Sequence, residues 1–313
     1  MTALSNPTHT DTAGFTNAIA IYYDRKLLER LEFDLFMNQF GEKRQLPKAK
    51  GNSVTFTRYN NFAANTSALS EGVIPDGEAL QSTQINAVPV QYGSYVTLSD
   101  QLITEAIDPV IQGAIDVLGY QAALSLDTVI QTTLHTHVTN QFAGGAANEL
   151  ALVTGDVVNA NEIRKAVKTL KTVAARPFSG GYVAVLHPAS AYDIMSDNAV
   201  GGWLDINKYT VTGPTYNGEI GKLYGARVVE SQNIQTGTTT STLTDYRNWV
   251  IAKQAYGVID LAGHNLKMIA KQLGSSGVGD PLDQLSTVGY KFSHVTKVLD
   301  AIRMIELFGV SAS

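Results

Sequence analysis

GNSVTFTRYNNF at residues 51–62 and TQINAVPVQYGSYVTL at residues 83–98 decide the fold predicted for this chain of 313 residues. In the first stretch the apolar Val54 and Phe56 alternate with threonines, and the second is rich in β-branched and aromatic residues. Both features are typical of strands. The segment between them, AANTSALSEGVIPDGEAL at residues 63–80, carries seven polar residues together with two glycines and a proline. The pattern predicts an extended arm of two strands with an irregular tip.

The tip carries turn signals at Gly72 and at Pro75-Asp76-Gly77. A ribbon of only two strands is marginally stable in water, so the arm must lie on something. It either folds back on its own domain or reaches across a neighbouring copy of the chain. The residues leave both arrangements open.

Upstream of the arm, residues 1–14 are polar and without a period, so we expect a flexible segment unless a partner orders it. Residues Phe15–Phe40 have apolar side chains at helical spacing, and Gly41 ends the pattern. The apolar groups cover more than one face of this helix. We therefore expect it to be buried on two sides, one of which a partner subunit could supply.

Downstream of the arm, Asp108-Pro109 is a helix start, with Asp as the N-cap and Pro in the first turn. An apolar stripe continues to about His137, which predicts a spine helix roughly 40 to 45 Å long. The sequence Gln141–Asn148 is predicted to be a Gly/Ala loop between subdomains.

The rest of the chain alternates predicted helices and strands, which indicates a mixed α/β unit. Asn159 and Glu162 form a capping-box start for one helix, and Pro188 starts another after a short buried strand. Further strands are predicted at 182–187, 218–234, 248–261 and 287–310. The threonine-rich segment 236–245 is predicted to be an exposed, mobile loop.

Composition narrows the classes of function. Charged residues are 16% of the chain against roughly 25% in an average globular protein, which suits a surface hidden in an assembly or an uncharged polar monomer surface. The net charge of −5 argues against tight general binding to nucleic acid. Cysteine is absent, so disulfides and thiolate ligands are excluded, and no apolar stretch is long enough to predict a membrane span.

The chain shows no local motif for catalysis. G-x-S-x-G is absent, and the glycine run 274–279 lacks the Lys-Ser/Thr end of a phosphate-binding loop, so we interpret it as a hinge. His135 and His137 are two residues apart, which does not place them on one helix face for a metal. We predict no catalytic, cofactor or metal site. A triad built from distant residues stays open, because chain order does not constrain it.

Charges of opposite sign gather at the two ends of the predicted arm. Glu71, Asp76 and Glu78 lie on the tip, whereas basic residues cluster just before the first strand, at Lys43, Arg44, Lys48 and Lys50. This distribution would suit a contact from one copy to the next. Solvated charged faces remain the alternative.

Several short segments, in this order, resemble a known family. They are YYDRKLL at residues 22–28, LSEGV at 69–73, YGSYVTLSD at 92–100, His187-Pro188, GEIG at 218–221 and LYG at 223–225. Together they resemble the major capsid protein of tailed bacteriophages (Caudoviricetes), whose fold is shared with the floor of herpesvirus shells. The chain looks like the short form of this protein, without a fused scaffolding domain.

The resemblance implies an α+β fold with five parts. They are an N-terminal arm and helix at 1–40, an E-loop with flanking strands at 41–98, a P-domain with the spine helix at 99–148, an A-domain at 149–280, and C-terminal strands returning to the P-domain at 281–313. It implies no cofactor.

The resemblance also implies a function: self-assembly into an icosahedral phage head that encloses double-stranded DNA without sequence-specific binding. Contacts between subunits would involve Lys43, Arg44, Lys48, Lys50, Arg58, Glu71, Val73, Ile74, Pro75, Asp76 and Glu78 of the E-loop, and Phe15, Tyr22, Tyr23 and Arg25 of the N-terminal segment. Hexamers and pentamers would form in the host bacterial cytoplasm with a separate scaffolding protein and a portal, and possible cement proteins, to give the virion shell. The alternatives are an encapsulin-like nanocompartment shell and a hydrolase with a dispersed catalytic site.

Overall fold

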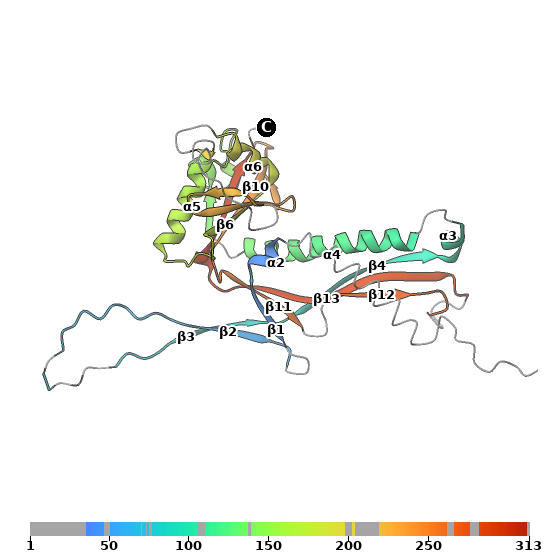
Figure 1. The fold of residues 1–313 in the computed structure, drawn as a ribbon, viewed down its shortest axis with the longest axis horizontal. Helices are drawn as coiled ribbons and strands as arrows, with labels where there is room; N and C mark the ends of the chain where they lie inside the picture. Colours follow the sequence, from blue (N-terminus) through green and yellow to red (C-terminus); the bar gives the residue numbers. More distant parts are fainter. Residues whose placement is uncertain are drawn as a thin grey trace, which may run out of the picture.

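The computed structural model describes residues 36–46, 51–69, 71–72, 74, 77–105, 110–136, 139–197, 202–203, 219–261, 266–275 and 282–311. Within them the chain forms a long sheet, a compact sheet with helices, and a two-stranded arm that projects from the long sheet (Figure 1). One long helix runs beside the long sheet and reaches the compact unit.

The long sheet has five strands, in the order β1-β11-β13-β12 with β4 also paired to β13. Their bounds are β1 Glu42–Leu46, β4 Val90–Ser99, β11 Tyr256–Leu261, β12 Lys267–Lys271 and β13 Leu285–Val298. The fourteen-residue β13 is its centre, because β4, β11 and β12 all run antiparallel to it.

The compact sheet has seven strands, in the order β5-β14-β10-β6-β8-β7 with β9 also paired to β10. Their bounds are β5 Thr139–Phe142, β6 Tyr182–Leu186, β7 Glu219–Leu223, β8 Ala226–Glu230, β9 Thr236–Thr238, β10 Thr244–Ile251 and β14 Met304–Val310. Helices α5 (Ala160–Thr172) and α6 (Pro188–Met195) bury their apolar faces against one side of this sheet.

The spine is α4, Val110–His135, whose 26 residues give a length of about 39 Å at 1.5 Å per residue. Its buried stripe packs against Val288 and Tyr290 of the long sheet and against Trp249 of the compact sheet. One continuous hydrophobic core therefore joins the two sheets. Short helices complete the described chain: α2 Met37–Phe40 beside α4, α3 Asp100–Glu105, and the 3₁₀ turns Ala143–Gly145, Glu149–Ala151 and Ala301–Arg303.

A two-stranded ribbon runs from one sheet into the other. β10 pairs with β14 in the compact sheet, and each continues along the chain to or from a strand of the long sheet, β11 or β13, which pair with each other. At the crossing, the carbonyl of Ala255 accepts hydrogen bonds from the amides of Leu299 and Asp300, and the Ala252 amide donates to the Arg303 carbonyl at 2.9 Å. The ribbon is therefore hydrogen-bonded through the junction.

Several predictions from sequence are confirmed. The spine helix is present, β6 is buried at every position, and Pro188 begins α6. Asn159 caps α5 by accepting a hydrogen bond from the Glu162 amide at 3.1 Å. Of the helix predicted over Phe15–Phe40, the described residues include only its last turn, which ends at Gly41. A Cβ at Gly41 would lie 2.4 Å from Val258 Cγ2, so close packing also favours glycine there.

Other predictions were wrong in detail. The predicted loop Gln141–Asn148 begins inside β5, a mostly polar edge strand that lacks an apolar pattern because it pairs on one side only, with β14. The threonine-rich segment is not simply an exposed loop, since Thr236–Thr238 pairs with β10 and Thr239 is buried. Residues 83–98 are two strands in different sheets, separated at Val88-Pro89 because proline has no amide to donate.

The predicted domain limits do not follow the sheets. β11 and β12, within the range assigned to the A-domain, belong to the long sheet with β13, whereas the C-terminal β14 lies inside the compact sheet. The chain thus passes between the sheets more often than a linear division allows. The assignment of the sheets to named domains stays a prediction. The predicted cap at Asp108-Pro109 lies outside the described residues. Residues 276–279, which are most of the glycine run, also lie outside them.

Among the described residues, no helix combines the length and the apolarity required to cross a membrane.

Candidate assembly interface

The arm consists of β2 (Val54–Tyr59) and β3 (Ser82–Ala87), antiparallel and in register from Val54–Ala87 to Tyr59–Ser82. Its base is fixed to the long sheet by a small apolar cluster of Phe56 and Ala87 from the arm with Leu46 and Ile259 from β1 and β11. The base therefore belongs to its own chain.

Phe56 is the central residue of this base. Its ring lies over Gly257, where a Cβ would approach Phe56 Cζ to 2.5 Å, so only glycine accommodates the ring at this distance. On the other side, the Arg44 guanidinium lies 4.6 Å from the centre of the ring, a cation–π contact. Burial of one aromatic side chain thus holds the arm to β11.

An ion-pair network lies beside the base. Arg58 of β2 hydrogen-bonds the Asp300 carboxylate, which also accepts a hydrogen bond from Arg303 Nε at 3.0 Å. Because Arg58 is half exposed, this pair is screened by water and contributes at most about 1 kcal/mol. The pair links β2 of the arm to the segment between β13 and β14.

The tip, residues 61–80, lies beyond the last ladder bond, from the Asn60 amide to the Gln81 carbonyl at 2.9 Å. Its described side chains are exposed, including the apolar Ile74, Leu69 and Leu80 at 93%, 76% and 64%. The tip projects away from both sheets (Figure 1). Apolar residues at the end of such a projection have no partner among the described residues of their own chain.

The predicted contact residues separate into two groups that the fold keeps apart. Lys43 and Arg44 lie on β1 and Arg58 on β2, at the base, whereas Glu71, Ile74 and Glu78 lie on the tip. Figure 1 shows that base and tip are at opposite ends of the arm. Their opposite charges therefore do not meet within one chain. The other predicted contact residues lie outside the described residues: Lys48, Lys50, Val73, Pro75, Asp76, Phe15, Tyr22, Tyr23 and Arg25.

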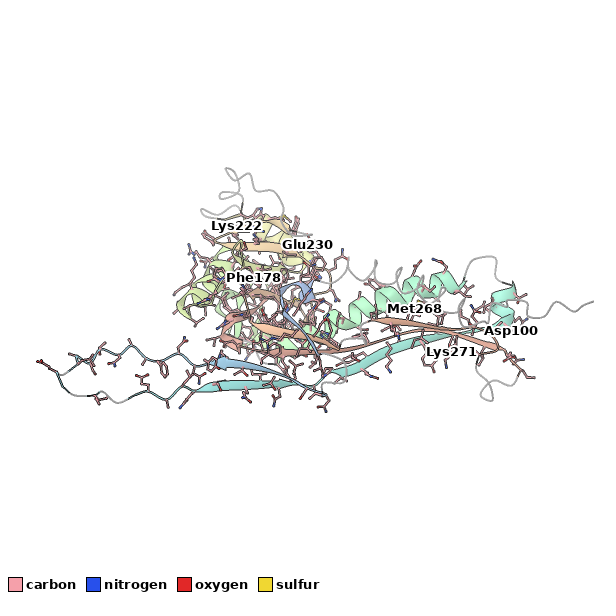
Figure 2. The ribbon with its side chains drawn as sticks, turned by 60° about the horizontal axis from the view of Figure 1, so that its bottom comes forward. Asp100, Phe178, Lys222, Glu230, Met268 and Lys271 are labelled. Atoms are coloured by element: carbon pink, nitrogen blue, oxygen red, sulfur yellow. The ribbon has the colours of Figure 1, made fainter. Side chains whose placement is uncertain are left out.

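The long sheet carries a groove that sequence reasoning missed. It has a volume of about 540 Å³ and is lined by residues of β4, β12 and β13, among them Gly93, Tyr95, Ile269, Lys271 and Lys291. Most of these residues belong to the face of the sheet opposite α4, because their neighbours Met268 and Tyr290 are buried in the core shared with that helix. Figure 2 labels Met268 and the groove residue Lys271, which lie on the same strand, β12. No helix among the described residues covers the side opposite α4, which we call the free face.

The positive charges of the groove come from only part of the chain, and this uneven distribution is visible in the sequence. From residue 59 to residue 163 the chain has no lysine or arginine, although it has eleven acidic residues there. The arm tip, β4 and α4 therefore carry no cationic side chain. The lysines of the long sheet are Lys43 of β1, before this stretch, and Lys267, Lys271, Lys291 and Lys297 of β12 and β13, after it.

A buried carboxylate stabilises the junction between α4, α2 and the compact unit. Asp127 accepts hydrogen bonds from the Met37 amide at 3.1 Å and from the Gln131 and Asn233 side chains at 2.8 Å each. Burial raises the pKa of Asp127, and these three donors oppose the rise. The group thus joins three segments that are distant in sequence.

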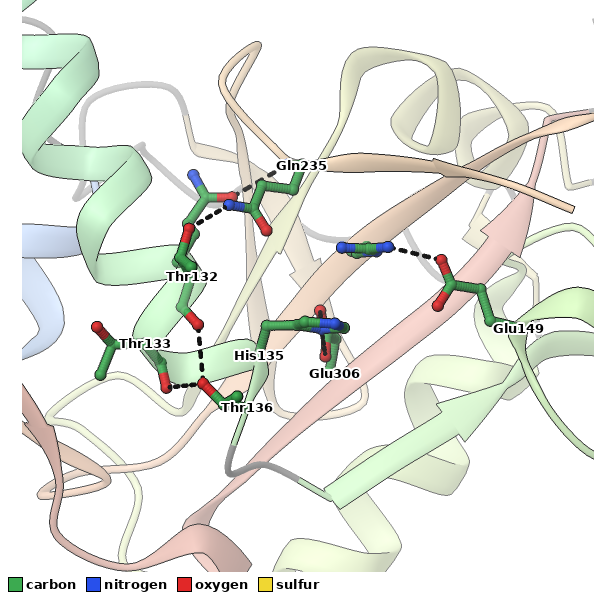
Figure 3. A network of polar contacts seen from close by, with 9 residues as sticks. Thr132, Thr133, His135, Thr136, Glu149, Gln235 and Glu306 are labelled. Atoms are coloured by element: carbon green, nitrogen blue, oxygen red, sulfur yellow. Dashed lines mark hydrogen bonds and ion pairs between the residues drawn. The ribbon is translucent and has the colours of Figure 1, made fainter.

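A second polar cluster lies in the compact unit (Figure 3). His135 Nδ1 lies 2.8 Å from the buried Glu306 carboxylate, and Arg247 donates to Glu149 at 2.7 Å. Burial raises the pKa of Glu306, and His135 opposes that rise. Gln235 also donates to Thr132 of α4 at 2.9 Å, which ties the compact sheet to the spine.

Asp245 completes this cluster, and none of the described residues donates a hydrogen bond to either of its carboxylate oxygens. A Cβ on Gly237 would lie 2.3 Å from Glu149 Oε1 and 2.6 Å from Asp245 Oδ1, so the two carboxyl groups face each other across that glycine. The pKa of Asp245 is raised to about 6, mainly by burial and to a smaller extent by the nearby Glu149 charge. A proton held between the two groups would satisfy both.

One arrangement bears on hydrolysis. His294 lies between Asp260 Oδ1, at 3.1 Å from Nδ1, and Thr296 Oγ1, at 2.9 Å from Nε2. This is the order of acid, base and hydroxyl in a catalytic triad. However, Thr296 is only 3% exposed, so a substrate carbonyl cannot reach its hydroxyl in this conformation. Within the described ranges, no three potential metal-ligating side chains come together.

Comparison with known families shows the family to which the chain belongs. Residues 82–305, more than half of the chain, match the model of the family described as phage capsid protein. The chain belongs to the phage capsid protein family. No curated protein matches this capsid protein in sequence.

Solved structures support the same fold for this capsid protein. The capsid of Ralstonia phage GP4 superposes with a TM-score of 0.70 at 14% identity, over 90% of this chain and 92% of that one. The cyanophage Pam1 capsid gives 0.65 at 13% identity, over 85% and 87%. The virus-like particle from Pyrococcus furiosus gives 0.54 at 8%, over 91% and 98%. The α+β capsid fold predicted from the sequence is therefore confirmed, and the chain is a structural protein of a phage capsid.

Proposed function

We propose that this capsid protein assembles into hexamers and pentamers of an icosahedral head that encloses double-stranded DNA. In this proposal the arm is the E-loop and lies over a neighbouring subunit, the compact unit is the A-domain and surrounds the fivefold and sixfold axes, and the N-terminal segment ties subunits together. The observation that carries the proposal is the arm, whose base is packed in its own chain while its tip has exposed apolar side chains.

The free energy gained by burying apolar side chains favours a contact between the tip and a neighbouring subunit. Ile74, Leu69 and Leu80 expose most of their surface, and burying one such side chain completely stabilises a complex by about 1.5 to 3 kcal/mol. Each shell contains many equivalent arms, so this gain is repeated at every subunit. Exposed apolar groups of this size on a projecting segment are typical of an interaction site.

The proposal includes partners and a location. A separate scaffolding protein directs assembly in the host bacterial cytoplasm, a portal occupies one vertex, and cement proteins reinforce the shell if the phage encodes them. The DNA is enclosed without sequence-specific contacts, in keeping with the net charge of −5. The role is structural, with no catalytic activity assigned to any residue.

The test is the particle size of the purified protein, measured by light scattering and negative-stain microscopy, alone and with its scaffolding protein. Closed shells, or rings of six and five subunits, are the expected result. A stable monomer or dimer in the presence of scaffold would overturn the proposal. Shells that contain an enzyme cargo and no DNA would point to a nanocompartment instead.

A further inference from the structure

We propose that residues 146–154 form a flap over the compact sheet, and that a proton shared between Asp245 and Glu149 holds this flap closed. The flap is a pH-sensitive device within a single chain. The inference therefore goes beyond the proposed function and does not depend on how the subunits assemble.

Glycines mark both ends of the flap. Gly144 and Gly145 precede it and Gly155 follows it, with positive φ values of 65°, 82° and 104°. A Cβ placed on Gly145 or Gly155 would meet nothing within 4 Å, so the backbone turns there without close neighbours. The Asp156 side chain ties the two ends together, because it lies over Gly144 and accepts a hydrogen bond from the Val153 amide at 2.9 Å. The flap is thus a closed loop between two glycine hinges.

Every third side chain of the flap faces the sheet. Ala146, Glu149 and Leu152 are partly or fully buried, whereas the other residues of the flap are exposed. Side chains three residues apart lie on one side of a 3₁₀ turn, and Glu149–Ala151 is such a turn. Leu152 is fully buried in one cluster with Phe308 of β14, and Ala146 packs against that cluster. The apolar anchor of the flap is therefore one leucine with one alanine.

Few polar contacts join the flap to other segments of the described chain. The Thr240 amide donates to the Leu150 carbonyl at 3.3 Å, and Arg247 Nη2 of β10 donates to Glu149 Oε1 at 2.7 Å (Figure 3). Other backbone hydrogen bonds of the flap are local, such as that from the Leu152 amide to the Glu149 carbonyl. A segment with one main apolar anchor and so few bonds opens at a lower free-energy cost than the sheet beneath it.

The charges beneath the flap do not balance. Among the described residues, two charged groups face Asp245: Glu149 of the flap and Arg247 of the same strand. The paired strand β9 contributes only the uncharged Gly237 at this position. Arg247 can neutralise one of the two carboxylates, which leaves one negative charge buried. A proton on either carboxyl group would remove that charge and would form a hydrogen bond between the two groups.

A second titratable pair lies further along the same two strands. Glu306 of β14 is opposite Trp249 of β10, and His135 of α4 contacts the Glu306 carboxylate at 2.8 Å. Glu306 therefore has its own partner outside the flap. The test must separate this pair from the two carboxyl groups beneath the flap.

Rising pH should open the flap. Burial and then the Glu149 charge raise the pKa of Asp245 to about 6, so the closed flap holds the shared proton below that pH and loses it above. The two facing carboxylates then repel each other. If opening returns the pKa of Asp245 to 3.8, linkage predicts a rise of about tenfold in the opening constant between pH 5 and pH 8. Opening would expose Leu152 and Phe308, so the apolar surface of the compact unit would increase with pH.

Hydrogen–deuterium exchange of the purified full-length chain from pH 5 to pH 8 tests the inference. After correction for the intrinsic pH dependence of exchange, a peptide covering residues 146–156 should exchange about tenfold faster at pH 8 than at pH 5, and faster than β6 at every pH. D245N should keep the flap protected throughout, because its amide does not ionise and can donate to Glu149. E149Q should also abolish the pH dependence, and it provides the same test if D245N does not fold.

H135Q is the matched control, because it removes the histidine of the second pair and leaves both carboxyl groups beneath the flap in place. It should keep the tenfold rise. A rise that disappears in H135Q, or that persists in D245N and E149Q, would assign the pH dependence to other groups and overturn the inference. A flap that exchanges at the same corrected rate at every pH, or no faster than β6, would also overturn it.

Discussion

Replacement of Asp245 by asparagine should stabilise the compact unit at neutral pH. Asp245 lies in β10, is fully buried, and faces the Glu149 carboxyl group, with no donor to either oxygen among the residues that the structure describes. An amide cannot ionise, and its NH₂ group would donate a hydrogen bond to Glu149. The substitution therefore removes a buried repulsion and supplies the missing donor at once.

The magnitude follows from the pKa of Asp245, which burial and then the Glu149 charge raise from 3.8 to about 6. A shift of this size corresponds to about 3 kcal/mol. Because the folded pKa lies above the unfolded one, the folded state holds the proton more tightly between pH 3.8 and about 6. Stability should therefore fall as the pH rises through this window, and the full penalty is present above pH 6.

The measurement is urea unfolding of the unassembled chain from pH 4 to pH 8, followed by tryptophan fluorescence. D245N should gain up to about 3 kcal/mol at pH 7.5 and should converge on the original chain near pH 4. D283N, at an exposed aspartate, is the control and should change little at any pH. A D245N variant that is less stable at neutral pH, or whose advantage does not depend on pH, would refute the reasoning.

Three further substitutions test the junctions of the fold. D127A should destabilise the chain by roughly 3 kcal/mol in urea unfolding, because it leaves buried N–H donors of three segments unpaired; an unchanged midpoint would contradict this. L134A removes a buried side chain from the core that joins the two sheets and should cost about 2 to 5 kcal/mol, whereas L282A, at an exposed leucine, should not. G257V should displace the Phe56 ring and loosen the arm, so chymotrypsin should cut the arm several-fold faster while the tryptophan environment of the compact unit stays the same. Equal cleavage rates would show that the ring does not hold the base.

The elements with strong local patterns were predictable from sequence. The apolar stripe of α4 and the buried run of β6 are set by side-chain periodicity, and Asn159 and Pro188 mark helix starts through their own hydrogen-bonding chemistry. These signals are local, so no knowledge of the partner strands was necessary. The arm was predictable for the same reason, because alternation and turn residues lie within one stretch.

Features that depend on distant pairing were not predictable. β5 is a mostly polar segment that becomes a strand only because β14 offers an edge, and β11 and β14 belong to sheets that their sequence neighbours do not indicate. The groove arises from three strands separated by up to two hundred residues, and at its centre Gly289 lies between Tyr95 and Ile269. Only the uneven distribution of lysine and arginine could have pointed to it.

The ribbon shared by the two sheets has a mechanical consequence. The chain passes from one sheet to the other along both β10–β11 and β13–β14, and the two passages are hydrogen-bonded to each other at Ala252 and Ala255. Two adjacent, hydrogen-bonded connections bend easily out of the plane that contains them both. They strongly resist twisting of one sheet against the other. The softest motion of the compact unit should therefore be a swing in one plane, which in the proposed shell would leave the order of subunits around a ring unchanged while the curvature varies.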